Sequence, residues 1–391
     1  MKVKLSDLYD IGSSKRVFQS EWRDSGVPFY RAREIAKLSS DGTVDNELFI
    51  DEELYSEYIE KYGKPEAGDV MVTGVGTLGV CYVVKPDDRF YFKDGNILWF
   101  KQKAKDKILP EYLVKAFDSK EVKDFIDKNS SGTTVGTFTI QTAKKMEISL
   151  PSLGEQREII DKVTKIETII KQRKQELQLL DDLIKARFVE MFGDPVNNEK
   201  GWITDTVDNL CIEIYGGGTP SKVHPEYYED GDIPWVSSKD MKTDILTDSQ
   251  IKINQMGVEN STARMVPVNS VIMVIRSGIL KHTLPVAINA VPITVNQDLK
   301  VFIPSERILT RFLAVQFKMH EKDILTGVRA VTADNIEFNS LKQRKLIVPS
   351  IELQQEYVLF LEQVDKSKVA VQKALDETQI LFDSLMQKYF G

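Results

Sequence analysis

The feature that most constrains this chain is a long segment that occurs twice. Residues 152–192 align with residues 350–390 without a gap, and the alignment carries Gln156 onto Gln354. Within both copies, apolar residues recur every seven positions, which is the spacing of a coiled-coil helix and not that of a strand. An internal repeat of this length means that the two halves of the chain should fold alike.

The heptad pattern defines one apolar seam along each predicted helix. In the first copy the seam residues are Ile159, Val163, Ile166, Ile170, Leu177, Leu180 and Ile184. In the second copy they are Tyr357, Leu361, Val364, Val371, Leu375, Phe382 and Leu385. Because a single rod cannot bury such a stripe by itself, we expect the two copies to pair as an antiparallel coiled coil within the chain. The alternative is two unrelated amphipathic helices, each docked on its own domain.

Local signals at the ends of the repeat agree with long helices. Ser152 and Glu155 have the spacing of a capping box and follow Pro151, which indicates a helix start. Gly193 followed by Pro195 is typical of a helix end. The first helix should therefore extend over the whole first copy.

The segments that precede the two helices are also related. Leu5–Leu8 resembles Val207–Leu210, and Val27–Tyr30 resembles Ile233–Val236. Each half mixes short β-branched runs with amphipathic helical stretches, which predicts the α+β class. One such helix is expected in each domain, over residues 109–126 in the first and residues 309–320 in the second.

These patterns predict four parts: a first mixed α/β domain at 1–150, a central helix at 151–193, a second such domain at 194–348 and a C-terminal helix at 349–391. The net charge of −7 is spread so that no part is net basic. A protein of this charge can bind DNA only through local patches or with a basic partner.

Composition excludes several other classes of protein. The hydrophobic content of 42% without a long apolar run predicts a soluble cytoplasmic protein with no membrane span. Cys81 and Cys211 lie far apart in apolar runs, so we expect no disulfide framework. The three histidines are scattered without a second ligand at metal-binding spacing, so no metal site is predicted.

The most distinctive text lies in the second domain. Tyr215–Lys222 reads YGGGTPSK, and Gly231–Met241 reads GDIPWVSSKDM. With this glycine-Thr-Pro-Ser signature and the Ile-Pro-Trp segment, the chain resembles the specificity subunit of type I restriction-modification systems. The first domain has a degenerate version at Gly12–Arg16 and Pro28–Arg31. The resemblance covers the whole chain, including both helices.

The resemblance implies a subunit without catalytic residues that reads a split sequence of double-stranded DNA, with one target-recognition domain for each half. Two methyltransferase subunits are expected to dock on the helices, and restriction and translocase subunits would join through the complex. S-adenosylmethionine is expected in the methyltransferase partner, so no cofactor is assigned to this chain.

One motif invites an enzyme interpretation. Gly74–Gly79 reads GVGTLG, a GxGxxG that directly follows the strand-like run Asp69–Val72. A dinucleotide site needs a helix after the glycines, whose N-terminus faces the pyrophosphate. Val80–Val84 predicts another strand instead. We interpret the motif as a hairpin tip, and contact with DNA or no ligand at all are both open for it.

Candidate DNA-reading residues follow from side-chain chemistry, because arginine and lysine bind guanine or phosphate and hydroxyl groups bind bases or the backbone. In the first domain the candidates are Lys15, Arg16, Arg31, Arg33, Thr77, Thr133 and Thr134. In the second domain they are Thr219, Ser221, Lys222, Ser237, Ser238, Lys239, Arg276, Lys281 and Arg329.

Two other classes of function stay open. A coiled-coil scaffolding protein with two peptide- or protein-binding domains would explain the heptads and the acidity. A stand-alone enzyme would rest on the glycine motif alone. Co-purification with a methyltransferase, with a peptide ligand or with a bound nucleotide separates the three.

Overall fold

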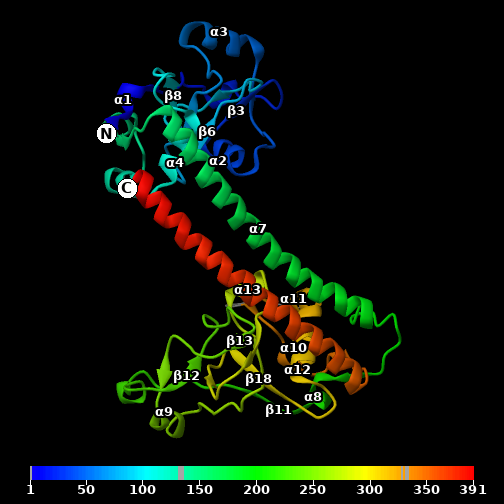
Figure 1. Cartoon of the computed structure of the whole chain (residues 1–391). Coiled ribbons are helices and arrows are strands. Elements are labelled where there is room, and N and C mark those ends of the chain that lie inside the picture. Colours follow the sequence, from blue (N-terminus) through cyan, green and yellow to red (C-terminus); the bar gives the residue numbers. More distant parts are fainter. Residues whose placement is uncertain (1, 131–135, 327–328, 331–333) are drawn as a thin grey trace. The chain divides into compact units, whose positions relative to one another are not determined.

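The computed structural model describes residues 2–130, 136–326, 329–330 and 334–391 (Figure 1). The chain divides into two compact units, Met1–Gln175 with Gln372–Gly391 and Glu176–Val371. Both division points fall inside the long helices. Each unit therefore holds one sheet domain, part of one long helix and part of the other.

The first domain contains two sheets and a short strand pair. An antiparallel sheet has the order β2 (Tyr9–Gly12), β8 (Ile97–Gln102), β5 (Val70–Thr73), β6 (Cys81–Val83). A second sheet has the order β4 (Phe49–Ile50), β3 (Val27–Tyr30), β7 (Tyr91–Phe92), in which β3 and β7 run parallel. Strand β1 (Lys2–Lys4) pairs antiparallel with β9 (Glu147–Ser149). Strand β5 (VMVT) is buried along its whole length, which agrees with the absence of a charged residue on either of its faces.

The helical elements of this domain are α1 (Leu5–Leu8), η1 (Gln19–Glu21), α2 (Ala32–Asp41), α3 (Glu52–Tyr62), α4 (Pro110–Asp118), α5 (Lys120–Asn129) and α6 (Ile140–Lys145). The single helix predicted over residues 109–126 is wrong, because the chain breaks there into α4 and α5. Ser119 adopts an extended conformation, and its hydroxyl accepts a hydrogen bond from the Val122 backbone N–H at 3.3 Å. A serine in that role favours a helix start over a helix interior.

The second domain has a larger sheet with the order β11 (Cys211–Gly216), β18 (Leu299–Pro304), β15 (Val271–Val274), β16 (Val286–Asn289), β13 (Ile245–Leu246). Its three-stranded sheet has the order β14 (Lys252–Ile253), β12 (Ile233–Val236), β17 (Thr294–Val295). Two short antiparallel pairs are β10 (Thr204–Thr206) with β21 (Lys345–Ile347) and β19 (Arg329–Ala330) with β20 (Asp334–Asn335). Its helical elements are α8 (Val207–Leu210), η2 (Pro225–Tyr227), α9 (Gln255–Glu259), η3 (Gly278–Lys281), α10 (Thr310–Met319), α11 (Glu321–Thr326) and α12 (Phe338–Lys342).

The two domains share one topology. The order β2-β8-β5-β6 corresponds to β11-β18-β15-β16, and β4-β3-β7 corresponds to β14-β12-β17. In both smaller sheets the last pair is parallel and the first is antiparallel. The second domain adds the edge strand β13, which runs parallel to β16. The duplication predicted from the sequence therefore extends to the order and direction of the strands.

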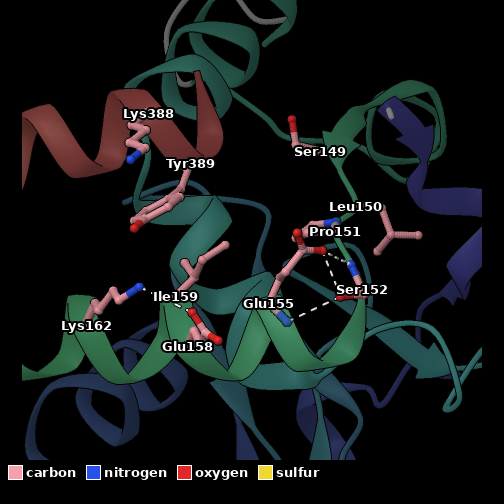
Figure 2. A pocket seen from close by; sticks show the side chains of 10 residues that line it. All are labelled: Ser149, Leu150, Pro151, Ser152, Glu155, Glu158, Ile159, Lys162, Lys388 and Tyr389. Carbon is pink, nitrogen blue, oxygen red and sulfur yellow. Dashed lines mark hydrogen bonds and ion pairs between the residues drawn. The ribbon is translucent and has the colours of Figure 1, made fainter.

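The two repeated segments form helices α7 (Leu153–Phe192) and α13 (Ile351–Phe390), each of 40 residues. The predicted capping box is present, since the Ser152 backbone N–H donates to Glu155 Oε2 at 2.9 Å (Figure 2). Gly193 ends α7 with a φ of +75°, a left-handed conformation that glycine adopts more readily than other residues. None of the helices in the described chain combines the length and the apolar content that a membrane span requires.

A buried glutamine joins each domain to the start of the helix that follows it. Gln156 Oε1 accepts from the Leu109 backbone N–H at 2.8 Å, and its amide donates to two carbonyl groups at 2.7 and 2.9 Å. Gln354 repeats this arrangement, accepting from Leu309 at 2.9 Å and donating at 3.1 and 2.9 Å. These bonds fix both helix starts in the same orientation to their own domains.

In the unit that holds the first domain, the start of α7 and the end of α13 share a core. Ile159 and Val163 of α7 are buried in one cluster with Met386 and Phe390 of α13. The Tyr112 ring of α4 lies 5.1 Å from the Phe390 ring. The first domain thus packs on both helices of its unit.

In the unit that holds the second domain, the end of α7 and the start of α13 meet in the equivalent way. The ring of Phe188 lies 5.5 Å from Tyr357 of α13 and 5.7 Å from Phe312 of α10. Lys368 and Asp181 form an ion pair of 2.6 Å between the two helices. In both units the helices therefore run in opposite directions where they meet.

Each predicted seam residue is buried or half-buried. The buried ones are Ile159, Val163, Tyr357, Leu361, Val364, Val371 and Leu375. The half-buried ones are Ile166, Ile170, Leu177, Leu180, Ile184, Phe382 and Leu385. Burial on this side of each helix agrees with the heptad register, and a continuous coiled coil stays a prediction.

Candidate nucleic-acid interface

Three loops of the first domain lie together at the ends of β2, β5 and β7; we name residues 12–16, 73–80 and 93–96 the first loop cluster. The Gly74 backbone N–H donates to the Asn96 carbonyl at 2.8 Å, which joins the second loop to the third. Arg16 Nε lies 3.0 Å from Asp94 Oδ2, which joins the first loop to the third. The fold therefore brings together candidates that are about sixty residues apart in sequence.

The backbone of the first loop is fixed by side chains from the loop and from the sheet. The hydroxyl groups of Ser13 and Ser14 donate to carbonyl groups of β8 and β7 at 3.0 and 2.6 Å. The Lys15 backbone N–H donates to the hydroxyl of Tyr91 at 3.1 Å. Lys15 and Arg16 are exposed, so two cationic side chains project from an ordered backbone.

Arg31 and Arg33 follow β3 and are engaged by carboxylates. Glu34 is fully buried and accepts from Arg31 at 2.8 Å and from Arg33 at 2.9 Å. Arg33 also pairs with Glu47 at 2.9 Å. Burial opposes the charge of Glu34, but the hydrogen bonds from both arginines outweigh it, so the pKa of Glu34 is lowered. Through these ion pairs, Arg31 and Arg33 stabilise the segment that follows β3.

The glycine motif at Gly74–Gly79 lies in the connection between β5 and β6, which pair antiparallel. The prediction of a hairpin tip is confirmed, and no helix follows the glycines as a dinucleotide site would require. Thr77 is exposed at this tip, within the first loop cluster. Thr133 and Thr134 lie outside the described residues.

The second domain has an equivalent arrangement; we name residues 216–222, 275–282 and 296–298 the second loop cluster. The Thr219 hydroxyl donates to Gln297, which joins the first loop to the third. Arg276 pairs with Asp298 at 2.6 Å, which joins the second loop to the third. Thr219, Ser221, Lys222 and Arg276 are all exposed.

Two aromatic side chains hold the glycine-Thr-Pro-Ser signature, and one of them comes from the Ile-Pro-Trp segment. Trp235 Nε1 donates to the Gly218 carbonyl at 2.9 Å, and the hydroxyl of Tyr228 donates to the Pro220 carbonyl at 2.6 Å. Both contacts use backbone carbonyl groups of the signature and side chains that are at least half buried. The two most distinctive segments of the sequence therefore hold the loop in place.

The glycines of this signature are required by close packing. A Cβ atom on Gly217 would lie 1.9 Å from the Val295 carbonyl oxygen. A Cβ atom on Gly218 would lie 2.3 Å from the carbonyl carbon of Thr262. No side chain fits at either distance, so both positions of the signature require glycine for steric reasons.

The segment after β12 carries three further candidates. Asp240 Oδ2 accepts from the Ser237 backbone N–H at 2.9 Å and from its hydroxyl at 2.8 Å. Ser237 and Ser238 are half-buried, and Lys239 is exposed. The Asn296 backbone N–H donates to the last carbonyl of β12 at 2.9 Å, which places this segment beside the second loop cluster.

Of the two remaining candidates, Lys281 belongs to the second loop cluster and Arg329 lies next to it. Lys281 is exposed at the end of η3. The backbone of Arg329 pairs with Asn335 across the β19–β20 ladder, and Asn335 also bridges to Arg276. The side chain of Arg329 lies outside the described part of the structure.

Sequence reasoning missed the loops that follow β7 and β17. They hold Asp94, Asn96, Gln297 and Asp298, which contact residues in the other loops of each cluster. The internal repeat could have indicated these loops. Each follows a strand, β7 or β17, that pairs in parallel with the Pro-containing strand of its domain, β3 or β12.

A separate hollow of about 600 Å³ lies where α7 begins and α13 ends (Figure 2). Ile159 and Tyr389 line it together with charged residues. Two of its acidic side chains are engaged by neighbours, since Glu158 pairs with Lys162 at 3.3 Å and Glu155 accepts from the Ser152 hydroxyl at 2.7 Å. Among the described residues there is no group of three or more acidic, histidine or cysteine side chains that could hold a metal ion.

Comparison with known proteins gives one consistent family. Residues 1–179 and 199–378 both match the family model described as the type I restriction modification DNA specificity domain. The specificity subunit of the Escherichia coli restriction enzyme EcoR124I/EcoR124II is 39% identical over 153 residues, 39% of this chain and 38% of that protein. A putative type I specificity subunit of Haemophilus influenzae is 28% identical over 187 residues, 48% of this chain and 45% of that protein. These matches thus span less than half the length of either relative.

The fold is also found among solved structures. The crystal structure of a type I restriction-modification S subunit from M. genitalium superposes with a TM-score of 0.56, covering 100% of this chain and 96% of that one. At 14% sequence identity the likeness is one of fold.

Proposed function

The chain belongs to the type I restriction-modification DNA specificity family, and from this premise we propose that it is a non-catalytic subunit that reads a bipartite DNA target. Each recognition domain reads one half-site through its own loop cluster. The observation that carries the proposal is the duplication, because two domains of one topology each present exposed arginine and hydroxyl side chains on loops at matching strand ends.

The proposed domain limits follow the repeat. Residues 1–150 and 194–348 form the two recognition domains, and residues 151–193 and 349–391 form the connecting helices. We further propose that α7 and α13 pair along their seams as an antiparallel coiled coil. The opposite direction of the two helices within each unit and the covered seam positions support this pairing.

The partners follow from the family and from the symmetry of the helices. Two equivalent helix surfaces suit two methyltransferase subunits, and restriction and translocase subunits join through that complex. The methyltransferase would supply S-adenosylmethionine and the transfer chemistry. Because neither recognition domain is net basic, these partners would also supply much of the attraction for DNA phosphates.

The DNA-reading candidates stay proposals, with different parts assigned to them. Exposed side chains of the loop clusters, such as Lys15, Thr77 and Lys222, are placed to approach bases or phosphates. Arg31 and Arg33 are engaged by Glu34 and so are proposed to shape the loop. The hypothesis of a stand-alone enzyme loses its support, because the glycine motif on which it rested is the connection of a β-hairpin.

The experiment that tests this function is methylation mapping. The chain is expressed with a methyltransferase subunit in a host without other adenine methylation, and the genome is sequenced for modified adenines. We expect one target with two specified parts separated by unspecified bases, and no methylation when the chain is omitted. Methylation independent of the chain, or at a single continuous sequence, would contradict the proposal.

A further inference from the structure

In each loop cluster, one exposed arginine forms an ion pair with one aspartate. The two aspartates lie in equivalent loops of the two domains. Arg16 Nε lies 3.0 Å from Asp94, which follows β7. Arg276 contacts Asp298, which follows β17, through Nε at 2.7 Å and Nη2 at 2.6 Å. Arg16 lies in the loop after β2, whereas Arg276 lies in the loop after β15. The two domains therefore place an arginine beside the equivalent aspartate from different loops.

In both pairs the outer edge of the guanidinium stays available. The contacts to aspartate use the Nε side of each arginine, and within the described chain neither guanidinium forms another hydrogen bond or ion pair. The side chains of Arg16 and Arg276 are 65% and 47% exposed, while Asp94 and Asp298 are 20% and 25% exposed. The terminal N–H groups form a planar fork that matches O6 and N7 of guanine in the major groove.

Both pairs are held by further bonds. Asp298 Oδ2 accepts from the side-chain amide of Asn296 at 3.1 Å, and its carbonyl accepts from the Ile275 backbone N–H at 2.9 Å. The carbonyl of Arg16 accepts from the hydroxyl of Tyr58 at 3.3 Å. The arginines are thus oriented before DNA arrives, which reduces the entropy lost on binding.

We infer that Arg16 and Arg276 each read one guanine of the target and that Asp94 and Asp298 are the residues that position them. This inference rests on the proposed function and adds the base that each domain reads. It adds Asp94 and Asp298 to the residues that act in recognition.

The aspartates favour a base over a phosphate as the ligand of these arginines. A phosphate bound on the outer edge would lie close to the carboxylate, and two negative charges at such a distance repel. A guanine edge carries acceptors without net charge, so it meets the fork without this repulsion. The same carboxylate that orients the arginine therefore disfavours sequence-independent binding.

The test uses the complex of the full chain with its methyltransferase subunits and duplexes that carry the mapped target. Guanines in each half-site are replaced one at a time by 7-deazaguanine, which lacks the N7 acceptor. We expect one guanine in each half-site at which the replacement weakens binding about tenfold to a hundredfold. Arg16→Lys should abolish that preference in one half-site only, and Arg276→Lys in the other only.

The positioning role is tested with Asp94→Asn and Asp298→Asn. Each variant keeps the size of the side chain and removes the negative charge, so guanine preference should fall while binding to unrelated DNA and its salt dependence should rise. A merely structural role would weaken both kinds of binding. Arg307→Lys is the matched control, because Arg307 pairs with Asp205 at 2.6 Å with 50% and 22% exposure, away from the loop cluster.

Three outcomes separate the hypotheses. Loss of one guanine preference per variant, with the control unchanged, supports the inference. Equal weakening of all sequences, with a salt slope reduced by about one, overturns it and identifies a phosphate contact. A parent complex without sequence preference overturns the proposed function itself, and the inference with it.

Discussion

The two recognition domains share a framework and differ in how their loops are built. Gln156 and Gln354 make the same set of hydrogen bonds at the two helix starts. At the strand ends the two domains use different donors. In the first domain the hydroxyl of Ser14 donates to the last carbonyl of β7 at 2.6 Å, and in the second domain the backbone N–H of Gly218 donates to the last carbonyl of β17 at 3.0 Å. The same anchor point is reached by a side chain in one domain and by the backbone in the other. Loop sequence can therefore change while the sheets stay the same.

The largest expected effect is on the stability of the glycine-Thr-Pro-Ser loop, which the first domain builds differently. Gly217→Ala should destabilise the second domain by about 3 kcal/mol or more, because the added carbon meets a carbonyl oxygen at 1.9 Å. Gly12→Ala in the first domain should stay within about 0.5 kcal/mol, since nothing lies within 4 Å of its added carbon. Urea unfolding with hydrogen exchange measures both. Equal effects would show that the two loops are not built differently.

The next effect tests the shared framework. Gln156→Leu and Gln354→Leu should each cost about 2–3 kcal/mol, because each leaves one N–H and two carbonyl groups without partners. Gln178→Leu is the control, as Gln178 is exposed on α7 and its side-chain amide donates to Asp182 at 3.2 Å. Unfolding of the full-length variants should give similar losses for the first two and almost none for the third. A large difference between the first two would mean that the helix starts are not equivalent.

A third effect depends on pH and belongs to the second domain alone. His320 is 2% exposed and neither ring nitrogen has a partner in the described chain. Burial lowers its pKa to about 4, with a smaller contribution from Arg344 against Asp323 and Asp194. Because the folded pKa lies below the ordinary 6.5, this group leaves stability intact above pH 6.5 and reduces it as the pH falls toward 4.

The expected loss at pH 5, relative to pH 7.5, is about 2 kcal/mol. His320→Leu should remove this part of the pH dependence, which is measured as the difference between variant and parent at both pH values. Hydrogen exchange should locate the weakening in the second domain, because the equivalent position after α4 of the first domain is Ser119, whose hydroxyl does not titrate in this range. Identical pH profiles for variant and parent would contradict the account.

The sequence was sufficient for the features that depend on local periodicity. The heptads predicted both long helices, and the strand after the glycine motif predicted the hairpin. The break at Ser119 was missed because an amphipathic pattern continues through it, while the capping hydroxyl decides the conformation.

The interior of the loop clusters was not predictable by the same means. The bond between Arg16 and Asp94 spans 78 residues of sequence, and that between Ser13 and the β8 carbonyl spans 84. Such pairs form only after the sheets have assembled, so no local pattern records them. Chemistry alone therefore selected Arg31 and Arg16 alike, although the fold engages the first with a buried carboxylate and leaves the second exposed.

The central claim is that each domain reads its own half of the target. Replacing residues 202–343 with the equivalent domain of another family member, and mapping methylated adenines for the chimera with its methyltransferase partner, tests this most directly. The account predicts that one half of the target changes to that of the donor and that the other half stays as in the parent. Altered bases in both halves, or an unchanged target, would contradict it.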